Sequence, residues 1–212
     1  YSMTTTTRPG IQRLFYVLTL GLLLGACTES TPRLPLLDSN SVILAFGDSL
    51  TRGSGAAVEQ SYPAVLSRLT GRTVINAGIP GEVSEQGLQR LPALLDRLRP
   101  DLLLLCHGGN DMLRRFSTDI TRENIEAMIS LAVERGIPVL LIGVPKPGLV
   151  FLKPAAFYAE IAEQYDLVYE GDILAEVESD NSLKADQIHP NADGYSQIAA
   201  ALHHLLQRSG AL

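Results

Sequence analysis

Short runs dominated by apolar residues recur along the sequence between residues 42 and 169. They lie at residues 42–46, 73–76, 102–106, 137–143 and 167–169, and the last of them is the weakest. Runs of this length and composition are typical of strands that are buried on both faces of a parallel sheet. The pattern therefore predicts a sheet of five strands.

The segments between these runs carry helical spacing of apolar residues or helix-boundary signals. They predict helices over residues 61–70, 84–97, 121–135, 154–165 and 193–208. Gly71 and Gly136 stand where glycine commonly ends a helix, and Pro154 stands where proline commonly begins one. Strands that alternate with helices predict an α/β fold with a parallel sheet covered on both faces. Ligands of such sheets bind beyond the carboxyl ends of the strands, so the loops there are the first place to look for a site.

The N-terminal residues form a separate segment. Residues 1–26 have the features of a secretory signal peptide: a basic start, an apolar run over residues 14–24, and small residues before a boundary. Leu24-Gly25-Ala26-Cys27 resembles a bacterial lipobox, which implies cleavage before Cys27, lipidation of Cys27 and a periplasmic, membrane-anchored lipoprotein of the cell envelope. An uncleaved anchor helix and a plain signal peptide that contains a cysteine are the alternatives. Residues 27–40 are expected to be a tether, and residues 41–212 the folded domain.

Composition and charge indicate the size of the folded domain and exclude some classes of binding partner. The chain is 46% hydrophobic and 19% charged, which fits one globular domain with a sizeable core. Its formal net charge is −6, so it is not built to neutralise phosphates, and we expect no nucleic-acid partner. The sequence shows no metal-ligand spacing, so we expect neither a metal nor another cofactor.

Cys106 closes an apolar run and is expected to be buried, whereas His107 either lines the site or only ends the strand.

Polar clusters follow three of the apolar runs and precede the last predicted helix. They are Gly47-Asp48-Ser49-Leu50-Thr51, Asn76-Ala77-Gly78, Gly108-Gly109-Asn110-Asp111 and Asp186-Gln187-Ile188-His189-Pro190. Each cluster taken alone is an ordinary turn, helix cap or strand end. Their joint occurrence on the edge where ligands bind indicates an active site.

In this order the clusters resemble the signature of the GDSL, or SGNH, hydrolase family, carried here by Ser49, Gly78, Asn110 and His189. The resemblance extends from residue 42 to the last helix and is closest to the bacterial arylesterase, lysophospholipase and thioesterase I branch. It implies a three-layer α/β/α sandwich, flavodoxin-like, around a five-stranded parallel sheet. It also implies that the oxyanion hole consists of the backbone N–H groups of Ser49 and Gly78 and the side-chain amide of Asn110.

The chemistry explains why these residue types are needed. A serine hydroxyl is a weak nucleophile, so Ser49 needs a neighbouring base to take its proton. Histidine suits that role because its ordinary pKa is about 6.5. Asp186, three residues before His189, is placed to accept from the other ring nitrogen and to orient the base. Asp48 and Asp111 are interpreted as residues that fix their loops.

Apolar residues in two loops predict a substrate pocket. These residues are Met112, Leu113 and Phe116 in the loop over residues 111–116, and Leu149 and Phe151 in the loop over residues 144–157, where Leu149-Val150-Phe151-Leu152 is an apolar cluster. The alternative is that they pack beneath their own loops. We expect a small-molecule ester or lipid substrate and an esterase acting on short to medium acyl or aryl esters, with thioesters and lysophospholipids in the same site. Deacetylation of a cell-envelope polysaccharide is the rival activity, and a non-catalytic binding lipoprotein is the rival from another class.

Overall fold

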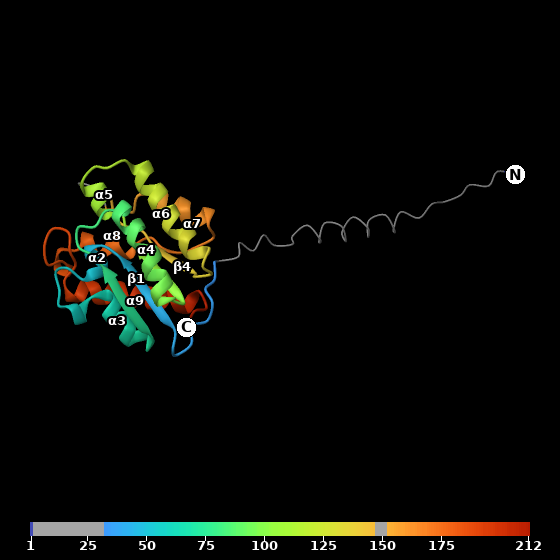
Figure 1. Cartoon of the computed structure of the whole chain (residues 1–212), viewed down its shortest axis with the longest axis horizontal. Coiled ribbons are helices and arrows are strands. Elements are labelled where there is room, and N and C mark those ends of the chain that lie inside the picture. Colours follow the sequence, from blue (N-terminus) through green and yellow to red (C-terminus); the bar gives the residue numbers. More distant parts are fainter. Residues whose placement is uncertain (2–31, 147–151) are drawn as a thin grey trace. The chain divides into compact units, whose positions relative to one another are not determined.

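The computed structural model describes residues 1, 32–146 and 152–212, and residues 32–212 group as one unit (Figure 1). A sheet of five parallel strands forms its centre, in the order β2-β1-β3-β4-β5. The strands are β1 (Val42–Gly47), β2 (Thr73–Gly78), β3 (Leu102–Cys106), β4 (Val139–Ile142) and β5 (Val168–Glu170). This arrangement confirms the predicted α/β fold with a five-stranded parallel sheet.

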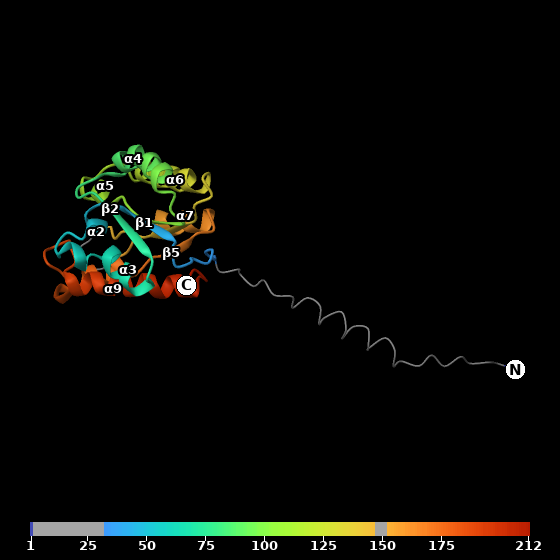
Figure 2. The same cartoon turned by 60° about the horizontal axis from the view of Figure 1, so that its bottom comes forward.

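Helices cover both faces of the sheet, as Figure 2 shows. On one face α4 (Ser84–Leu98) packs against α6 (Thr118–Val133), and on the other α3 (Tyr62–Thr70) packs against α9 (Ala192–Arg208). The remaining helices are α2 (Ser49–Arg52), α5 (Gly109–Leu113), α7 (Ala156–Gln164), α8 (Ile173–Ser179) and the 3-10 turns η1 (Val58–Gln60) and η2 (Asn181–Leu183). The described residues contain no helix that is both long enough and apolar enough to cross a membrane.

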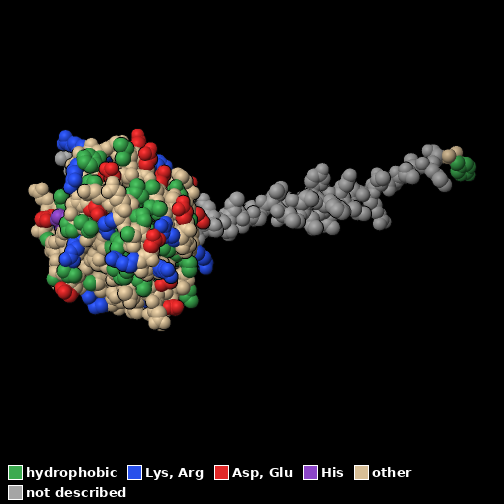
Figure 3. Space-filling model, in the orientation of Figure 1, with side chains coloured by type: hydrophobic (Ala, Val, Ile, Leu, Met, Phe, Trp, Pro, Cys, Tyr) green, Lys and Arg blue, Asp and Glu red, His purple; other side chains and the backbone are tan. Residues whose placement is uncertain are grey.

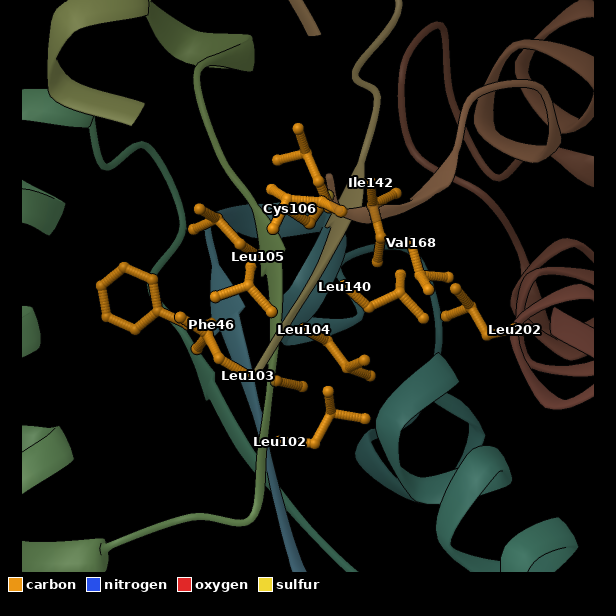
Figure 4. Packing of buried hydrophobic residues seen from close by; sticks show 14 of the residues in the cluster. Phe46, Leu102, Leu103, Leu104, Leu105, Cys106, Leu140, Ile142, Val168 and Leu202 are labelled. Atoms are coloured by element: carbon orange, nitrogen blue, oxygen red, sulfur yellow. The ribbon is translucent and has the colours of Figure 1, made fainter. Parts of the chain in front are cut away.

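The core is centred on β3. Every residue of this strand is buried, and its leucines pack with Phe46 of β1 and with side chains of β4, β5 and α9 (Figure 4). Burying one leucine side chain completely stabilises the folded state by about 1.5–3 kcal/mol. Because several leucines are buried here, the central strands form a rigid platform. Cys106 is 1% exposed, as expected of a small buried residue.

The strand order reverses at β1, because the chain passes from β1 outward to β2 and then returns to β3 on the other side. In open parallel sheets such a reversal leaves a crevice beyond the carboxyl ends of the two strands concerned. Here α2 follows β1 and α5 follows β3, and both lie beyond these strand ends (Figure 1). The topology therefore brings Ser49 and Asn110 to the same edge.

Helices α6 and α7 begin elsewhere than the sequence predicts, and the other boundaries of the predicted helices shift by at most two residues. Helix α6 begins at Thr118, three residues early, because the Ser117 side chain caps it by accepting from the Ile120 N–H at 3.5 Å. Helix α7 begins at Ala156, so Pro154 does not start it. Pro154 instead pairs with Pro145 in an antiparallel bridge that closes the loop between β4 and α7.

Part of the expected tether is folded. Leu34 and Leu37 are 8% and 3% exposed, and their N–H groups donate to the carbonyls of Ser209 and Ala211 at 3.0 and 2.9 Å. Two leucines three residues apart can pack on the C-terminal segment even though the stretch around them has no clear periodicity. The prediction of a tether over residues 27–40 is thus wrong for this part, while residues 1–26, apart from Tyr1, and Cys27 lie outside the described residues.

Candidate active site

Ser49 lies at the first position of α2, directly after β1. Gly47 permits this tight exit, because a Cβ there would lie 2.0 Å from the carbonyl oxygen of Cys106 in β3. The Asp48 side chain caps α2 by accepting from the Leu50 N–H at 3.1 Å. Asp48 is 2% exposed, and burial raises the pKa of its carboxyl above the ordinary value. Asp48 therefore fixes the turn that presents Ser49, as the sequence predicted.

His189 and Asp186 form a preassembled pair in the loop before α9. One carboxylate oxygen of Asp186 accepts from the N–H groups of Ile188 and His189, both at 2.8 Å, and the other accepts from His189 Nδ1 at 2.8 Å. The backbone N–H of His189, its ring and the N–H of Ile188 together lower the pKa of Asp186 to about 2. The carboxylate is consequently ionised at neutral pH.

The pair meets Ser49 across the top of the sheet. The His189 Nε2 atom lies 3.1 Å from Ser49 Oγ, within hydrogen-bonding distance. Because Asp186 is ionised and can only accept, the hydrogen between them is on Nδ1, and Nε2 is left to accept from the serine hydroxyl. Residues that are 140 positions apart in the sequence thus form one chain of hydrogen bonds.

Asn110 reaches the same edge from α5. Its Nδ2 donates to Asp48 Oδ2 at 3.1 Å and to the carbonyl oxygen of Glu82 at 3.0 Å. Asp111, which follows it, accepts from the Ser84 N–H at 2.8 Å and from the Ser84 hydroxyl at 2.6 Å. Asp111 therefore fastens α5 to the start of α4, in the loop-fixing role that the sequence predicted.

Gly78 is not placed as the resemblance implied. It ends β2, its N–H donates to Asn76 Oδ1 at 3.0 Å, and it is not among the residues that line the cavity at Ser49. A Cβ at Gly78 would lie 2.2 Å from the Arg52 nitrogen. The residue therefore allows β2 to pack closely on α2, and its amide is already used.

Gly81 stands at the position that Gly78 was expected to occupy. It lines the cavity with Pro80, it has φ +77°, and the Glu82 N–H donates to the Ile79 carbonyl at 3.2 Å to close the turn around it. Among the described residues, the Gly81 N–H donates no hydrogen bond. The sequence did contain a signal, since Pro-Gly is typical of a turn with positive φ at its third residue.

The cavity at Ser49 has a volume of about 630 Å³. Its apolar wall includes Leu113, Val144, Pro145, Leu152 and Ile188, and its polar side includes Glu178, Lys184 and Gln187. Burial raises the pKa of the Glu178 carboxyl to about 7. Leu113, Val144, Pro145 and Leu152 lie in the two loops where the sequence predicted the pocket, whereas Ile188 and the polar residues Glu178, Lys184 and Gln187 were not expected there.

The other expected pocket residues are elsewhere. Met112 lines a second cavity of about 310 Å³ between α6 and α7, and Phe116 is 51% exposed, so neither forms the wall at Ser49. Leu149 and Phe151 lie outside the described residues. Helix α5 turns Leu113 alone toward Ser49, which is why only one side chain of the predicted loop lines the cavity.

Charged side chains of both signs are interspersed over the face shown in Figure 3.

His107 is fully buried and does not line the cavity at Ser49. Among the described residues, no group of three or more acidic, histidine or cysteine side chains is placed to hold a metal ion.

Comparison with known proteins gives a consistent result. The sequence model of the GDSL-like Lipase/Acylhydrolase family matches residues 45–197. The chain is 32% identical over 172 residues to the thioesterase 1/protease 1/lysophospholipase L1 of Escherichia coli K12, a match that covers 78% of this chain and 83% of that protein. It is 39% identical over 110 residues to an arylesterase of Vibrio mimicus, covering 50% of this chain but only 55% of the arylesterase.

Solved structures agree with this relationship. The esterase AlinE4, an SGNH-hydrolase family member, superimposes with a TM-score of 0.63 at 32% identity, covering 82% of this chain and 98% of AlinE4. With the matched family model, the E. coli relative and the shared fold in view, the chain belongs to the GDSL-like lipase/acylhydrolase family of serine hydrolases.

Proposed function

We propose that this protein is a serine esterase that hydrolyses carboxylic esters through an acyl-enzyme on Ser49. The observation that carries the proposal is the hydrogen-bonded series Asp186–His189–Ser49, which opens onto a cavity with an apolar wall. A nucleophile, its base and the residue that orients the base are the parts that acyl transfer requires.

In the proposed reaction Ser49 Oγ attacks the ester carbonyl carbon while its proton passes to His189 Nε2. Asp186 keeps its negative charge and stabilises the imidazolium that results. His189 then gives the proton to the leaving alcohol, and the C–O bond of the ester breaks to leave the acyl group on Ser49. In the second half a water molecule gives its proton to His189 and attacks the acyl carbon. The bond between that carbon and Ser49 Oγ then breaks while His189 returns the proton to Oγ, which releases the acid and restores the serine.

The tetrahedral intermediate carries a negative oxygen that needs donors. We assign this role to the N–H groups of Ser49 and Gly81 and to the side-chain amide of Asn110, with Gly81 in place of Gly78. The Gly81 N–H has no acceptor among the described residues, which supports the assignment. In the free protein Asn110 donates to Asp48 and Glu82, so the bond to Asp48 must be shared or exchanged when the oxyanion forms.

The cavity suggests the substrate. Leu113, Val144 and Leu152 offer an apolar wall, and a volume of about 630 Å³ is enough for a short to medium acyl or aryl group. The names of the relatives, an arylesterase and a thioesterase 1/protease 1/lysophospholipase L1, support aryl esters, thioesters and lysophospholipids as further substrates. The polar side formed by Glu178 and Gln187 is the observation that favours the second candidate, deacetylation of a cell-envelope polysaccharide.

We also propose that Cys27 carries a lipid that anchors the enzyme to the bacterial cell envelope. The sequence Leu24-Gly25-Ala26-Cys27 supports this, although it lies outside the described residues. Labelling with a fatty-acid analogue in a bacterial host tests the proposal. We expect incorporation into the wild type and none into Cys27→Ser, and equal incorporation into both would refute the assignment.

The enzymatic proposal is tested with a series of p-nitrophenyl esters from acetate to palmitate. Ser49→Ala should lower kcat at least about a thousandfold, because the nucleophile is lost while the fold is kept. Ser54→Ala is the matched control, since Ser54 lines the same cavity and has no role in the proposed reaction. A rate maximum at medium chains supports an acyl esterase, activity on acetate alone supports a deacetylase, and full activity in Ser49→Ala would refute both.

A further inference from the structure

A charged network of Glu82, Arg90 and His107 lies beside the proposed oxyanion hole; Glu82 and His107 are buried, and the Arg90 side chain is 22% exposed. Glu82, 6% exposed, accepts from Arg90 Nε at 2.7 Å and from Arg90 Nη2 at 2.6 Å, so the guanidinium binds the carboxylate with two parallel bonds. His107, fully buried, contributes its Nε2 at 3.1 Å from Glu82 Oε2. Burial by itself raises the pKa of Glu82, but the bonds from His107 and Arg90 outweigh it and hold the pKa below its ordinary value.

Arg90 ties this network to the strand ends. Its Nη2 donates to the Ala77 carbonyl of β2 at 2.8 Å and to the Gly47 carbonyl of β1 at 3.3 Å. Its guanidinium carbon lies 4.0 Å from the ring centroid of Phe46, a distance at which cation and ring attract each other. Ser49 leaves the sheet from one of these strand ends, and the turn that contains Gly81 leaves from the other.

Glu82 connects the network to two of the proposed donors. It directly follows Gly81, and its N–H closes the turn around Gly81 by donating to the Ile79 carbonyl at 3.2 Å. Its own carbonyl oxygen accepts from Asn110 Nδ2 at 3.0 Å. Holding the Glu82 side chain therefore fixes both the direction of the Gly81 N–H and the position of the Asn110 amide.

His107 fastens the third element. Its Nδ1 accepts from the Gly108 N–H at 3.0 Å, so the ring hydrogen is on Nε2 and points to Glu82. Gly108, with φ +104°, is the N-cap residue directly before α5, the helix that carries Asn110. The ring fits beneath α4 only because Gly87 has no side chain, since a Cβ there would lie 2.4 Å from His107 Nε2.

We propose that Arg90, Glu82 and His107 are positioning residues that together set the geometry of the Gly81 and Asn110 donors. The inference rests on the proposed esterase function and extends it. A buried ion pair adds little net stability, because the cost of desolvating the charges offsets their attraction. What this network does supply is a fixed spacing between segments that leave β1, β2 and β3, and oxyanion stabilisation depends on such spacing.

The test uses two independent variants, Arg90→Met and His107→Leu, each of which removes the polar contacts but keeps much of the volume. We expect kcat to fall about 10- to 100-fold while KM changes less than about threefold, because donors to the oxyanion act in the transition state. Active sites are first counted with a fluorophosphonate that labels Ser49, so that kcat refers to folded enzyme. Arg90→Lys, which keeps the charge, should recover part of the loss.

Arg135→Met is the matched control. It removes a surface ion pair, in which Arg135 Nε lies 2.8 Å from Asp96 Oδ1, close to the 2.6 Å between Arg90 and Glu82, and it should leave kcat unchanged. If kcat per labelled site stays within threefold of wild type in either folded variant, the positioning role is refuted. The fluorophosphonate count separates a folding failure from this result, and Glu82→Gln, which keeps the size of the side chain but removes the charged pair, replaces any variant that does not fold. Failure of the esterase proposal itself is a different outcome, since wild type and Ser49→Ala would then have equal activity.

Discussion

Asp186 commits both of its carboxylate oxygens to the segment that carries His189, and Asp186→Asn tests what this arrangement does. The remaining oxygen of the asparagine can still accept from the N–H groups of Ile188 and His189. The new NH₂ group then faces His189 Nδ1, which must lose its hydrogen to accept it. The ring hydrogen moves to Nε2, where it faces Ser49, so the ring cannot take the serine proton.

The expected loss of kcat in Asp186→Asn depends on this tautomer change and on the exposure of the Asp186 side chain. The same replacement in the serine-protease template lowers kcat about 10⁴-fold, which corresponds to about 5.4 kcal/mol in the barrier. The Asp186 side chain is 55% exposed, so water weakens its hold on the ring. We therefore expect a smaller loss of about 10²- to 10³-fold in kcat, or about 3–4 kcal/mol.

The assay is initial-rate hydrolysis of p-nitrophenyl butyrate at pH 7.5, with folding checked by circular dichroism. Asp180→Asn is the control, because Asp180 also lies in a loop and accepts from the Ser182 N–H and hydroxyl at 2.8 and 2.7 Å without touching a histidine. It should retain wild-type activity. A kcat of Asp186→Asn within tenfold of wild type would refute the tautomer argument.

Stability measurements check three further features. Because burial raises the pKa of Glu178 from 4.5 to about 7, folded protein binds a proton that unfolded protein lacks between these pH values, so stability falls as pH rises through this window. Glu178→Gln should remove this pH dependence, which amounts to up to about 3 kcal/mol in the free energy of unfolding. Urea melts at pH 5 and pH 8 measure it, and an equal change in the free energy of unfolding between the two pH values in wild type and variant would contradict the prediction. Gly78→Ala should lower the free energy of unfolding more than Gly81→Ala in the same melts. Its Cβ would meet a backbone nitrogen at 2.2 Å, whereas a Cβ at Gly81 meets only the Arg114 guanidinium at 3.8 Å and the strain of φ +77°; the reverse order would exclude the packing role. Leu37→Ala should lower the free energy of unfolding by about 2–3 kcal/mol, whereas Leu36→Ala should change it very little, because Leu36 is 76% exposed. Equal effects of the two substitutions would contradict the packing of residues 34–37 on the domain.

The strands and the reacting side chains could be predicted from the sequence. Strands buried on both faces must be continuously apolar, and β3 therefore appears as an unbroken run. Ser49, Asp186 and His189 could be assigned because their clusters, in this order, resemble the signature of the GDSL family and stand on predicted loops at the ligand-binding edge. The structure brings these three together as expected.

Features that depend on three-dimensional placement could not be predicted in this way. Whether Gly78 or Gly81 presents a free N–H depends on which carbonyl or side chain faces it, and only the folded turn shows that the Gly78 N–H is bound to Asn76. The role of His107 could not be predicted, because its side-chain partner Glu82 lies 25 positions earlier in the sequence, in the loop after β2. The wall of the cavity is likewise assembled from loops that are distant in sequence.

Covalent trapping of the nucleophile tests the central claim most directly. The protein is incubated with a p-nitrophenyl alkylphosphonate, and its intact mass and its proteolytic peptides are measured. The proposed mechanism predicts one phosphonyl group per chain, located on the peptide that contains Ser49, with none on Ser49→Ala. A label of equal extent on Ser49→Ala, or on a different residue of the wild type, would contradict the assignment of Ser49 as the nucleophile.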